Sequence, residues 1–297
     1  MSGNLILTTV YGLNVNQVRP FFSSLSAVGF SGKTIVFASN ISEECRAMMA
    51  DHHAEIIDFE SLGLQLVYAS LAKRLLSLPK AVFRGYWQHP KDERCLLVNC
   101  WRFFAYHKYL LALTEKPEFI LLADSRDVVF QANPFVFTPG LSVASECVHG
   151  KISQSRGNSK WLWEAAGFSQ LKKLGDLTPV CAGTTAADYD SMIKYLGLMT
   201  SSLKDRFFWG LFDSVDQGLH NYFVHNQMIK PLQIHTNWHG PFLTLDSETV
   251  RLGNKNADGW LCNQNGSVVP IVHQYDRIKG LYQKNETVPP VWQFLVH

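Results

Sequence analysis

The first sixty residues alternate between short apolar runs and longer amphipathic segments. The apolar runs predict β-strands at 5–11, 34–38 and 55–59. The segments between them, 17–28 and 42–53, have a helical pattern, and Ser42 followed by Glu43 and Glu44 is typical of a helix N-terminus. This βαβαβ order predicts parallel strands joined by right-handed crossovers.

The rest of the chain continues the alternation less regularly. Helical patterns occur at 65–77, 96–113, 189–203 and 215–225, and apolar runs predict strands at 119–123, 141–146 and 180–185. The segment 149–164 is polar and contains Gly and Ser, which favours a loop. We therefore expect one α/β domain with a regular front half, 1–134, and a more irregular back half, 135–297.

Two carboxylates follow the apolar run that starts at Phe119. Asp124 and Asp127 come directly after it, and a second apolar run and an Asn133-Pro134 turn follow. Open α/β sheets bind ligands at the carboxyl ends of their strands. Mg²⁺ and Mn²⁺ favour carboxylate oxygen. The pair therefore predicts a metal site, and an Asp–Arg–Asp salt-bridged turn is the structural alternative.

Three later segments carry further candidate chemistry. The glycine of Cys181-Ala182-Gly183 lets the backbone approach a ligand or permits a bulge, or it is an ordinary strand glycine. Asp216-Gln217 offers an acid and an amide near a helix start. In the structural alternative, this segment is only the start of the helix, with Asp213 or Ser214 as its cap. A histidine after an apolar run, such as His273, can complete a carboxylate metal site or be structural.

In this order, the four segments resemble the GT-A class of nucleotide-sugar glycosyltransferases. The sequence is most similar to the branch that contains glycogenin and the bacterial lipooligosaccharide galactosyltransferases. It is also similar to bacterial and plant proteins with an Asp-x-Arg-Asp-Val-Val-Phe-Gln segment, which begins here at Asp124. The resemblance covers most of the chain, with close matches in the four segments. It implies a GT-A-like fold, which is a Rossmann-like, mainly parallel sheet flanked by helices.

The resemblance implies a metal and a set of site residues. Asp124 and Asp127 match the Asp-x-Asp motif that holds Mn²⁺ or Mg²⁺ against the donor diphosphate, with one extra residue between them, and His273 matches the third ligand. Cys181-Ala182-Gly183 is similar to an Asn-Ala-Gly turn along the donor sugar, with Cys in place of Asn. The Asp-Gln pair that flanks the reacting sugar carbon in this class corresponds to Asp216 and Gln217.

The chemistry of sugar transfer suits these residue types. A divalent cation stabilises the negative charge that develops on a diphosphate leaving group. Asp216 could act as base on the acceptor hydroxyl, with inversion, or Asp216 and Gln217 could stabilise an oxocarbenium-like state, with retention. Glu146 is a second candidate base. The branch resemblance favours retention.

The remaining candidates concern the two substrates. In this class the end of the first strand, here Thr9 and Tyr11, binds the nucleotide base, so the front half would hold the nucleotide donor. Candidate donor contacts are Thr9, Tyr11, Asp58, Arg102, Asp124, Ala182, Gly183, Arg277 and Lys279. Tyr11 and Asp58 could instead be a surface and a turn residue, and Arg102 could form a structural pair with Asp124.

The back half would bind the acceptor and carry the catalytic residues. Sugar faces pack on aromatic rings, so Trp161, Trp163, Trp238 and His239 are candidate walls of an acceptor site, or core residues.

Composition narrows the partners. The hydrophobic content of 46% and charged content of 18% are those of an ordinary folded protein. A net charge of +2 without a dense basic stripe argues against nucleic-acid binding. No apolar run approaches the length of a membrane span. The six cysteines include no CxxC pair, and no signal-peptide pattern occurs at the start. We expect a cytoplasmic protein without a transmembrane segment.

The sequence thus predicts a glycosyltransferase, specifically a hexosyl- or pentosyltransferase, that moves a sugar from a UDP-linked donor to an oligosaccharide or glycoconjugate acceptor with a divalent metal. A non-catalytic nucleotide-sugar or glycan-binding protein on the same fold is one alternative. Another is a different metal-dependent phosphate-handling enzyme, against which the lack of a Gly-rich phosphate loop weighs.

Overall fold

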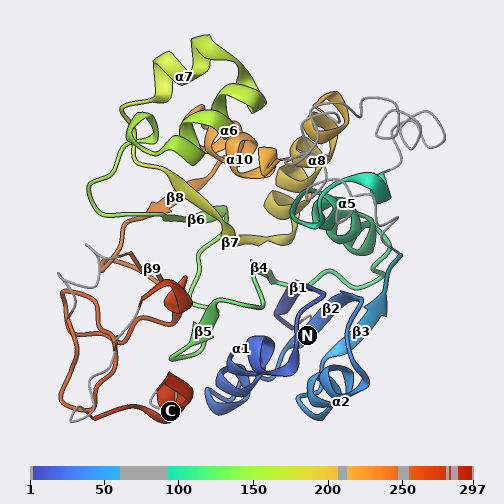
Figure 1. The fold of residues 1–297 in the computed structure, drawn as a ribbon, viewed down its shortest axis with the longest axis vertical. Helices are drawn as coiled ribbons and strands as arrows, with labels where there is room; N and C mark the ends of the chain where they lie inside the picture. Colours follow the sequence, from blue (N-terminus) through green and yellow to red (C-terminus); the bar gives the residue numbers. More distant parts are fainter. Residues whose placement is uncertain are drawn as a thin grey trace, which may run out of the picture.

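A seven-stranded mixed sheet forms the centre of the structure, a computed structural model that describes residues 3–60, 93–206, 213–246, 254–278, 281 and 287–295 (Figure 1). Its strands are β1 (Leu5–Tyr11), β2 (Lys33–Ser39), β3 (Glu55–Asp58), β4 (Phe119–Ala123), β6 (Leu141–Ser145), β7 (Val180–Asp188) and β8 (Leu232–His235). They lie in the order β3-β2-β1-β4-β7-β6-β8. The strands from β3 to β4 are parallel, and β7 runs antiparallel to both of its neighbours. The expected α/β class with a mainly parallel sheet is confirmed.

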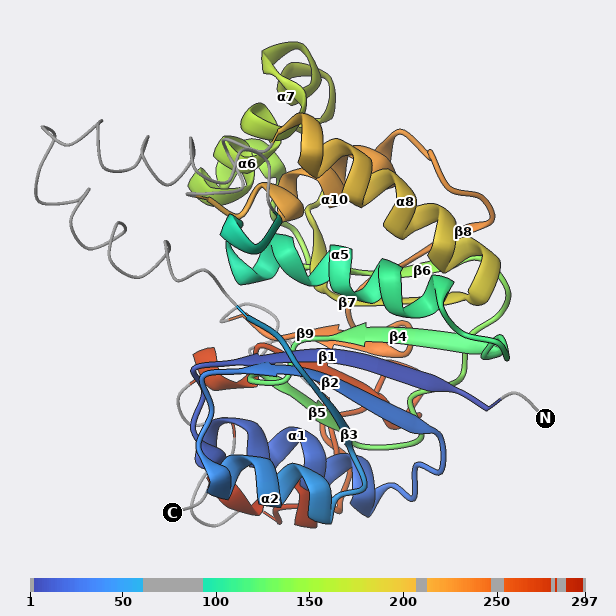
Figure 2. The same cartoon turned by 90° about the vertical axis from the view of Figure 1, so that its right-hand side faces the viewer.

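Helices cover both faces of this sheet (Figure 2). One face packs against α1 (Val15–Ala27) and α2 (Glu43–Asp51), and the other against α5 (Val98–Leu111), α8 (Tyr189–Asp205) and α10 (Val215–His225). Because side chains alternate along a strand, Leu5 and Leu7 of β1 join one core and Ile6 joins the other. None of the described helices has the length and apolar character of a membrane span.

Capping residues set the starts of the first helices. The Asn14 side chain accepts from the backbone N–H of Gln17, whose side chain accepts from that of Asn14, so α1 begins earlier than its apolar pattern predicts. The predicted Ser42 cap is present, since its hydroxyl accepts from the Cys45 N–H at 3.2 Å.

A second, three-stranded sheet joins residues that are distant in sequence. It contains β5 (Val128–Phe130), β10 (Ile271–His273) and β9 (Phe242–Thr244), with β10 in the middle. The buried Gln131 side chain bonds the backbone of Leu261 and Val269 and the Trp292 indole, which fixes the chain around this sheet. In the register of β5 and β10, His273 is opposite Val128, the residue after Asp127.

The prediction of a loop at 149–164 is wrong. A 3₁₀ turn, η2 (Ile152–Gln154), leads into α6 (Arg156–Ala166), and α7 (Phe168–Leu174) follows. Ser155 caps α6 by accepting from the Asn158 N–H. The first turn contains Gly157 and Asn158, which have low helix propensity, and the helix is stabilised by packing of its buried face with α10. The helix expected at 65–77 lies outside the described residues. Three short turns, η1 (Glu93–Cys95), η3 (Tyr275–Arg277) and η4 (Pro290–Leu295), complete the described elements.

We predict that Gly218→Ala destabilises the fold by about 1–3 kcal/mol, the usual cost of overpacking. A β-carbon at Gly218 would lie 2.0 Å from the Trp161 carbonyl oxygen and 2.9 Å from Ala165 Cβ, so α6 and α10 would have to separate. Urea unfolding measures the change. The control is Gly197→Ala on α8, where the nearest atom is 3.8 Å away, and it should be neutral or stabilising. Equal stability of the two variants would contradict the prediction.

Candidate active site

The structure brings Asp124, Asp127 and His273 together. Asp124 follows the last residue of β4, Asp127 precedes β5, and His273 ends β10. His273 Nε2 lies 3.4 Å from Asp127 Oδ1 and 3.8 Å from Asp124 Oδ2. One ligand atom from each residue can be chosen so that all three lie within 4.8 Å of one another. The cluster therefore forms where the large and the small sheet meet.

The chemistry of these atoms fits a divalent cation. Asp127 Oδ1 and His273 Nε2 are buried without a hydrogen-bond partner. Such buried polar atoms are costly unless something pairs with them. Two carboxylates and one imidazole are ligands that Mn²⁺ or Mg²⁺ can accept, and Asp124, whose side chain is 32% exposed, leaves one side open to solvent.

The second ring nitrogen of His273 faces Cys181. Its Nδ1 lies 3.5 Å from the Cys181 sulfur. The contact of Nδ1 with that sulfur orients Nε2 toward the carboxylates, where Nε2 carries a proton that a bound cation would replace. Burial lowers the pKa of His273, but Cys181 and Asp127 outweigh burial and hold it well above its usual value. Burial raises the pKa of Asp127, and His273 and Arg277 outweigh burial there and lower it.

Gly183 forms a wall of the cluster. A β-carbon at this position would lie 2.7 Å from Asp124 Oδ2 and 2.8 Å from His273 Nε2. The Gly183 carbonyl also accepts from the Asp124 N–H at 2.9 Å. Close packing of two side chains against the backbone is therefore the reason for glycine here, and the approach of a ligand stays a prediction.

Arg102 of α5 connects the cluster to a second acid. Its guanidinium donates to Asp124 Oδ1 and lies 3.6 Å from Asp216 Oδ2. The structural Arg–Asp pair that the sequence left open is thus present. Arg102 bonds one carboxylate oxygen of Asp124, Oδ1, and so orients the side chain. The other oxygen, Oδ2, faces His273.

Asp216 is buried at the start of α10, with 3% of its surface exposed. The Asn99 amide donates to it at 2.9 Å, and Cys100 Sγ lies 3.7 Å away. Burial raises the pKa of Asp216 to about 6 although Arg102 lowers it. The Ser214 side chain makes no cap bond to this helix. A carboxyl that titrates near neutral pH is suited to proton transfer.

Asn99 and Asn158 are the polar partners that the sequence did not single out. Asn99 lies three residues before Arg102 on the same helix, so it could have been found from helical spacing. Asn158 lies in the segment expected to be a loop, and its amide donates to Glu146 at 2.7 Å. Gln217 Nε2 is 3.5 Å from the same Glu146 oxygen. Glu146 and Gln217 are therefore neighbours.

The expected donor residues at the sheet edge have partners of their own. Thr9 shares a hydrogen bond with the Tyr106 hydroxyl at 2.8 Å. Asp58 is exposed and bonds Arg46 at 2.6 Å, and the Tyr11 ring lies 6.1 Å from that of Phe59. The backbone N–H of Ala182 bonds Gln217. Arg277 is exposed, and Lys279 lies outside the described residues.

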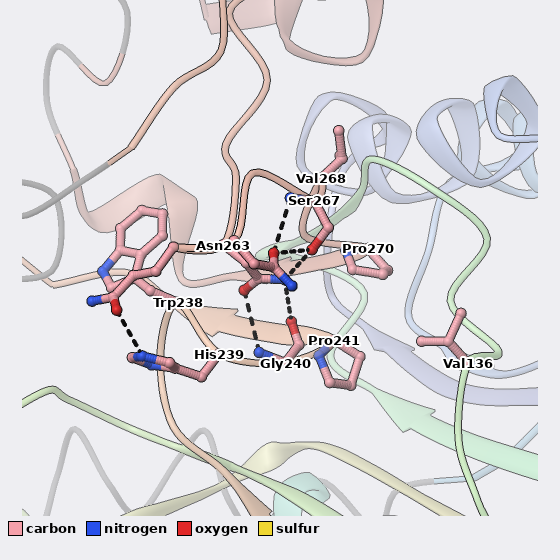
Figure 3. Close-up of a pocket in the computed structure, with 11 residues that line it drawn as sticks. Val136, Trp238, His239, Gly240, Pro241, Asn263, Ser267, Val268 and Pro270 are labelled. Atoms are coloured by element: carbon pink, nitrogen blue, oxygen red, sulfur yellow. Dashed lines mark hydrogen bonds between the residues drawn. The ribbon is translucent and has the colours of Figure 1, made fainter.

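The expected acceptor residues divide into two groups, neither of them at the cluster. Trp161 and Trp163 belong to α6, where the Trp161 indole donates to Asp213 and Trp163 is 47% exposed. Trp238 and His239 line a separate pocket of about 690 Å³ (Figure 3). Pro241 and Pro270, which precede β9 and β10, line it too, so it lies at the opposite end of the small sheet from His273.

We predict that Gly183→Ala weakens Mn²⁺ binding about 10–100-fold, because the new methyl group would displace two ligand atoms. Calorimetric titration with Mn²⁺ measures the affinity, and circular dichroism checks the fold. Gly197→Ala is again the control and should bind as the wild type does. Unchanged affinity in a folded Gly183→Ala protein would exclude this position from the metal centre.

We predict a pH-dependent stability difference for Asp216→Asn. A carboxyl pKa raised to about 6 means that the folded state holds a proton that the unfolded state has lost, so ionisation weakens folding as the pH rises through 6. Asparagine cannot ionise. The stability of the variant relative to wild type should therefore increase between pH 4 and 7.5, by up to about 3 kcal/mol.

Urea unfolding at several pH values measures this difference. Asp190→Asn, at an exposed carboxyl on α8, is the control and should show no comparable trend. A stability difference between Asp216→Asn and wild type that does not change with pH would mean that the pKa of the Asp216 carboxyl is not raised.

Of the comparisons with known proteins, the one with solved structures finds matches. No family model and no curated protein sequence matches the chain. Among solved structures, the chain is similar to the galactosyltransferase LgtC in complex with donor and acceptor sugar analogues, with 12% identity, a TM-score of 0.48, and coverage of 98% of this chain and 93% of that chain. An active-site mutant of LgtC gives the same values.

Proposed function

We propose that this protein is a glycosyltransferase that moves a sugar from a UDP-linked donor to an oligosaccharide or glycoconjugate acceptor with the help of Mn²⁺ or Mg²⁺. The observation that carries the proposal is the buried, unsatisfied set of Asp127 Oδ1 and His273 Nε2 beside Asp124. The four matching sequence segments supply the reaction class.

The donor would lie along the carboxyl ends of β1 and β4. Ligands of open α/β sheets bind at such edges. The turn after β4 is tied to this edge, because Ser125 Oγ donates to the Thr9 carbonyl at 2.9 Å. A cation held by Asp124, Asp127 and His273 would neutralise charge on the leaving diphosphate when bound. Tyr11 and Arg277 are exposed enough to contact the nucleotide base and the phosphates.

Asp216 would serve the reacting carbon. Asn99 and Arg102 hold its carboxylate in one orientation, and its pKa of about 6 leaves it ionised at neutral pH. It can then stabilise positive charge on the sugar ring, which gives retention, or accept the acceptor proton, which gives inversion. The resemblance favours retention. Glu146 is the second candidate base, and the two tryptophans of α6, Trp161 and Trp163, are candidate acceptor contacts. Trp238 is buried in the core, and the pocket that it lines with His239 lies away from the cluster.

A thermal-shift panel with UDP, GDP and CMP, each with and without Mn²⁺, tests the proposal. A nucleotide at a hundred times its Kd stabilises the folded state by about 2.7 kcal/mol, which is a shift of several degrees at this size. We expect a Mn²⁺-dependent shift with UDP that Asp127→Ala abolishes. Asp190→Ala is the matched carboxylate control and should keep the shift. No shift with any nucleotide would favour a protein without a donor site.

A further inference from the structure

We propose that Gln217 is a positioning residue, which holds a bulge of β7 that shapes the metal centre, and that it is not the group that reacts with the sugar. The inference rests on the function proposed above. It concerns the part played by the amide that the resemblance places beside the reacting carbon.

The bulge lies at the middle of the site. Between the consecutive β6 residues Val143 and Ala144, the partner on β7 changes from Thr185 to Cys181. The β7 residues between those two partners, 182–184, therefore have no counterpart on β6. A bulge removes ladder hydrogen bonds and leaves backbone groups that need other partners.

A side chain of α10 supplies one of those partners, and two side chains of α10 hold β7 at Val180, just before the bulge. Gln217 Oε1 accepts from the Ala182 N–H at 2.9 Å, and its Nε2 donates to the Val180 carbonyl at 2.8 Å. Asn221, one helical turn later, accepts from the Val180 N–H and donates to its carbonyl, both at 3.0 Å. Gln217 thus pairs a backbone N–H inside the bulge, and both amides fix Val180, which is opposite Ser145 of β6.

The bulge in turn holds two of the three candidate ligands. Cys181 Sγ contacts His273 Nδ1 and accepts from the Gly183 N–H at 3.4 Å. The Gly183 carbonyl accepts from the Asp124 N–H. A shift of the bulge would therefore move Asp124 and His273 relative to each other, and metal affinity depends on such supporting contacts.

The amide of Gln217 is fully engaged within the protein. Besides Val180, its Nε2 donates to Asn158 Oδ1 at 3.1 Å, so both N–H bonds and the oxygen have protein partners. Its oxygen accepts a hydrogen bond from the β7 backbone, so this oxygen holds the strand in place and is not available to a sugar.

Amide hydrogen exchange and Mn²⁺ titration of Gln217→Ala test the inference. The Ala182 N–H loses its partner, so we expect faster exchange at Ala182 and Mn²⁺ affinity about 10–100-fold weaker. Added Mn²⁺ should restore part of the lost turnover. The matched control is Gln233→Ala on β8, whose amide bonds Thr138, and it should change neither quantity.

Two results would overturn the inference. One is unchanged exchange at Ala182 in Gln217→Ala, whatever happens to kcat. The other is a glycosyl adduct at position 217 in Gln217→Glu, found by mass spectrometry. If the wild-type protein neither binds Mn²⁺ nor transfers sugar, the proposed function fails and the positioning role with it, whereas unchanged exchange at Ala182 removes the positioning role alone.

Discussion

The site depends on the ion pairs that the buried guanidinium of Arg102 forms with two carboxylates. The guanidinium lies between Asp124 and Asp216, so one cation links α5, the end of β4 and the start of α10. Removing one partner from such a buried ion group typically costs about 3–5 kcal/mol, because the remaining charges lose their compensation. Arg102 also cancels part of the charge of Asp124. Asp127 and His273 lie 3.4 Å apart and are the other buried charged pair of the site.

Two residues separate Asp124 from Asp127, one more than in an Asp-x-Asp motif, and this spacing has a structural reason. Asp124 follows a strand of the large sheet and Asp127 precedes a strand of the small sheet, so the two carboxylates have different supports. The residues between them are both used: Ser125 bonds the end of β1, and Arg126 forms an ion pair with Asp276 at 2.6 Å. The segment therefore joins the sheets as well as presenting ligands.

Much of this arrangement follows from local sequence, and the rest does not. The βαβαβ opening and the acids after Phe119 are visible because apolar periodicity and strand ends are local properties. The position of His273 depends on the pairing of β10 with β5, which the local pattern does not contain. Helix α6 was missed because packing against α10 overcomes the weak propensity of its first turn. The glycine at 183 is compatible with a bulge, but the partners of Gln217 depend on how α10 packs on β7, which the local pattern does not contain.

The late position of β10 has a consequence for the order in which the protein matures. The contact between Arg126 and Asp276 spans 150 residues, and His273 lies beside it in the chain. Ribosomes deliver the N-terminal strands first, at about 5–20 residues per second. The large sheet can therefore begin to assemble while its two acids still lack their imidazole partner. A nascent chain would complete the cluster of Asp124, Asp127 and His273 only after β10 has been made and has paired with β5.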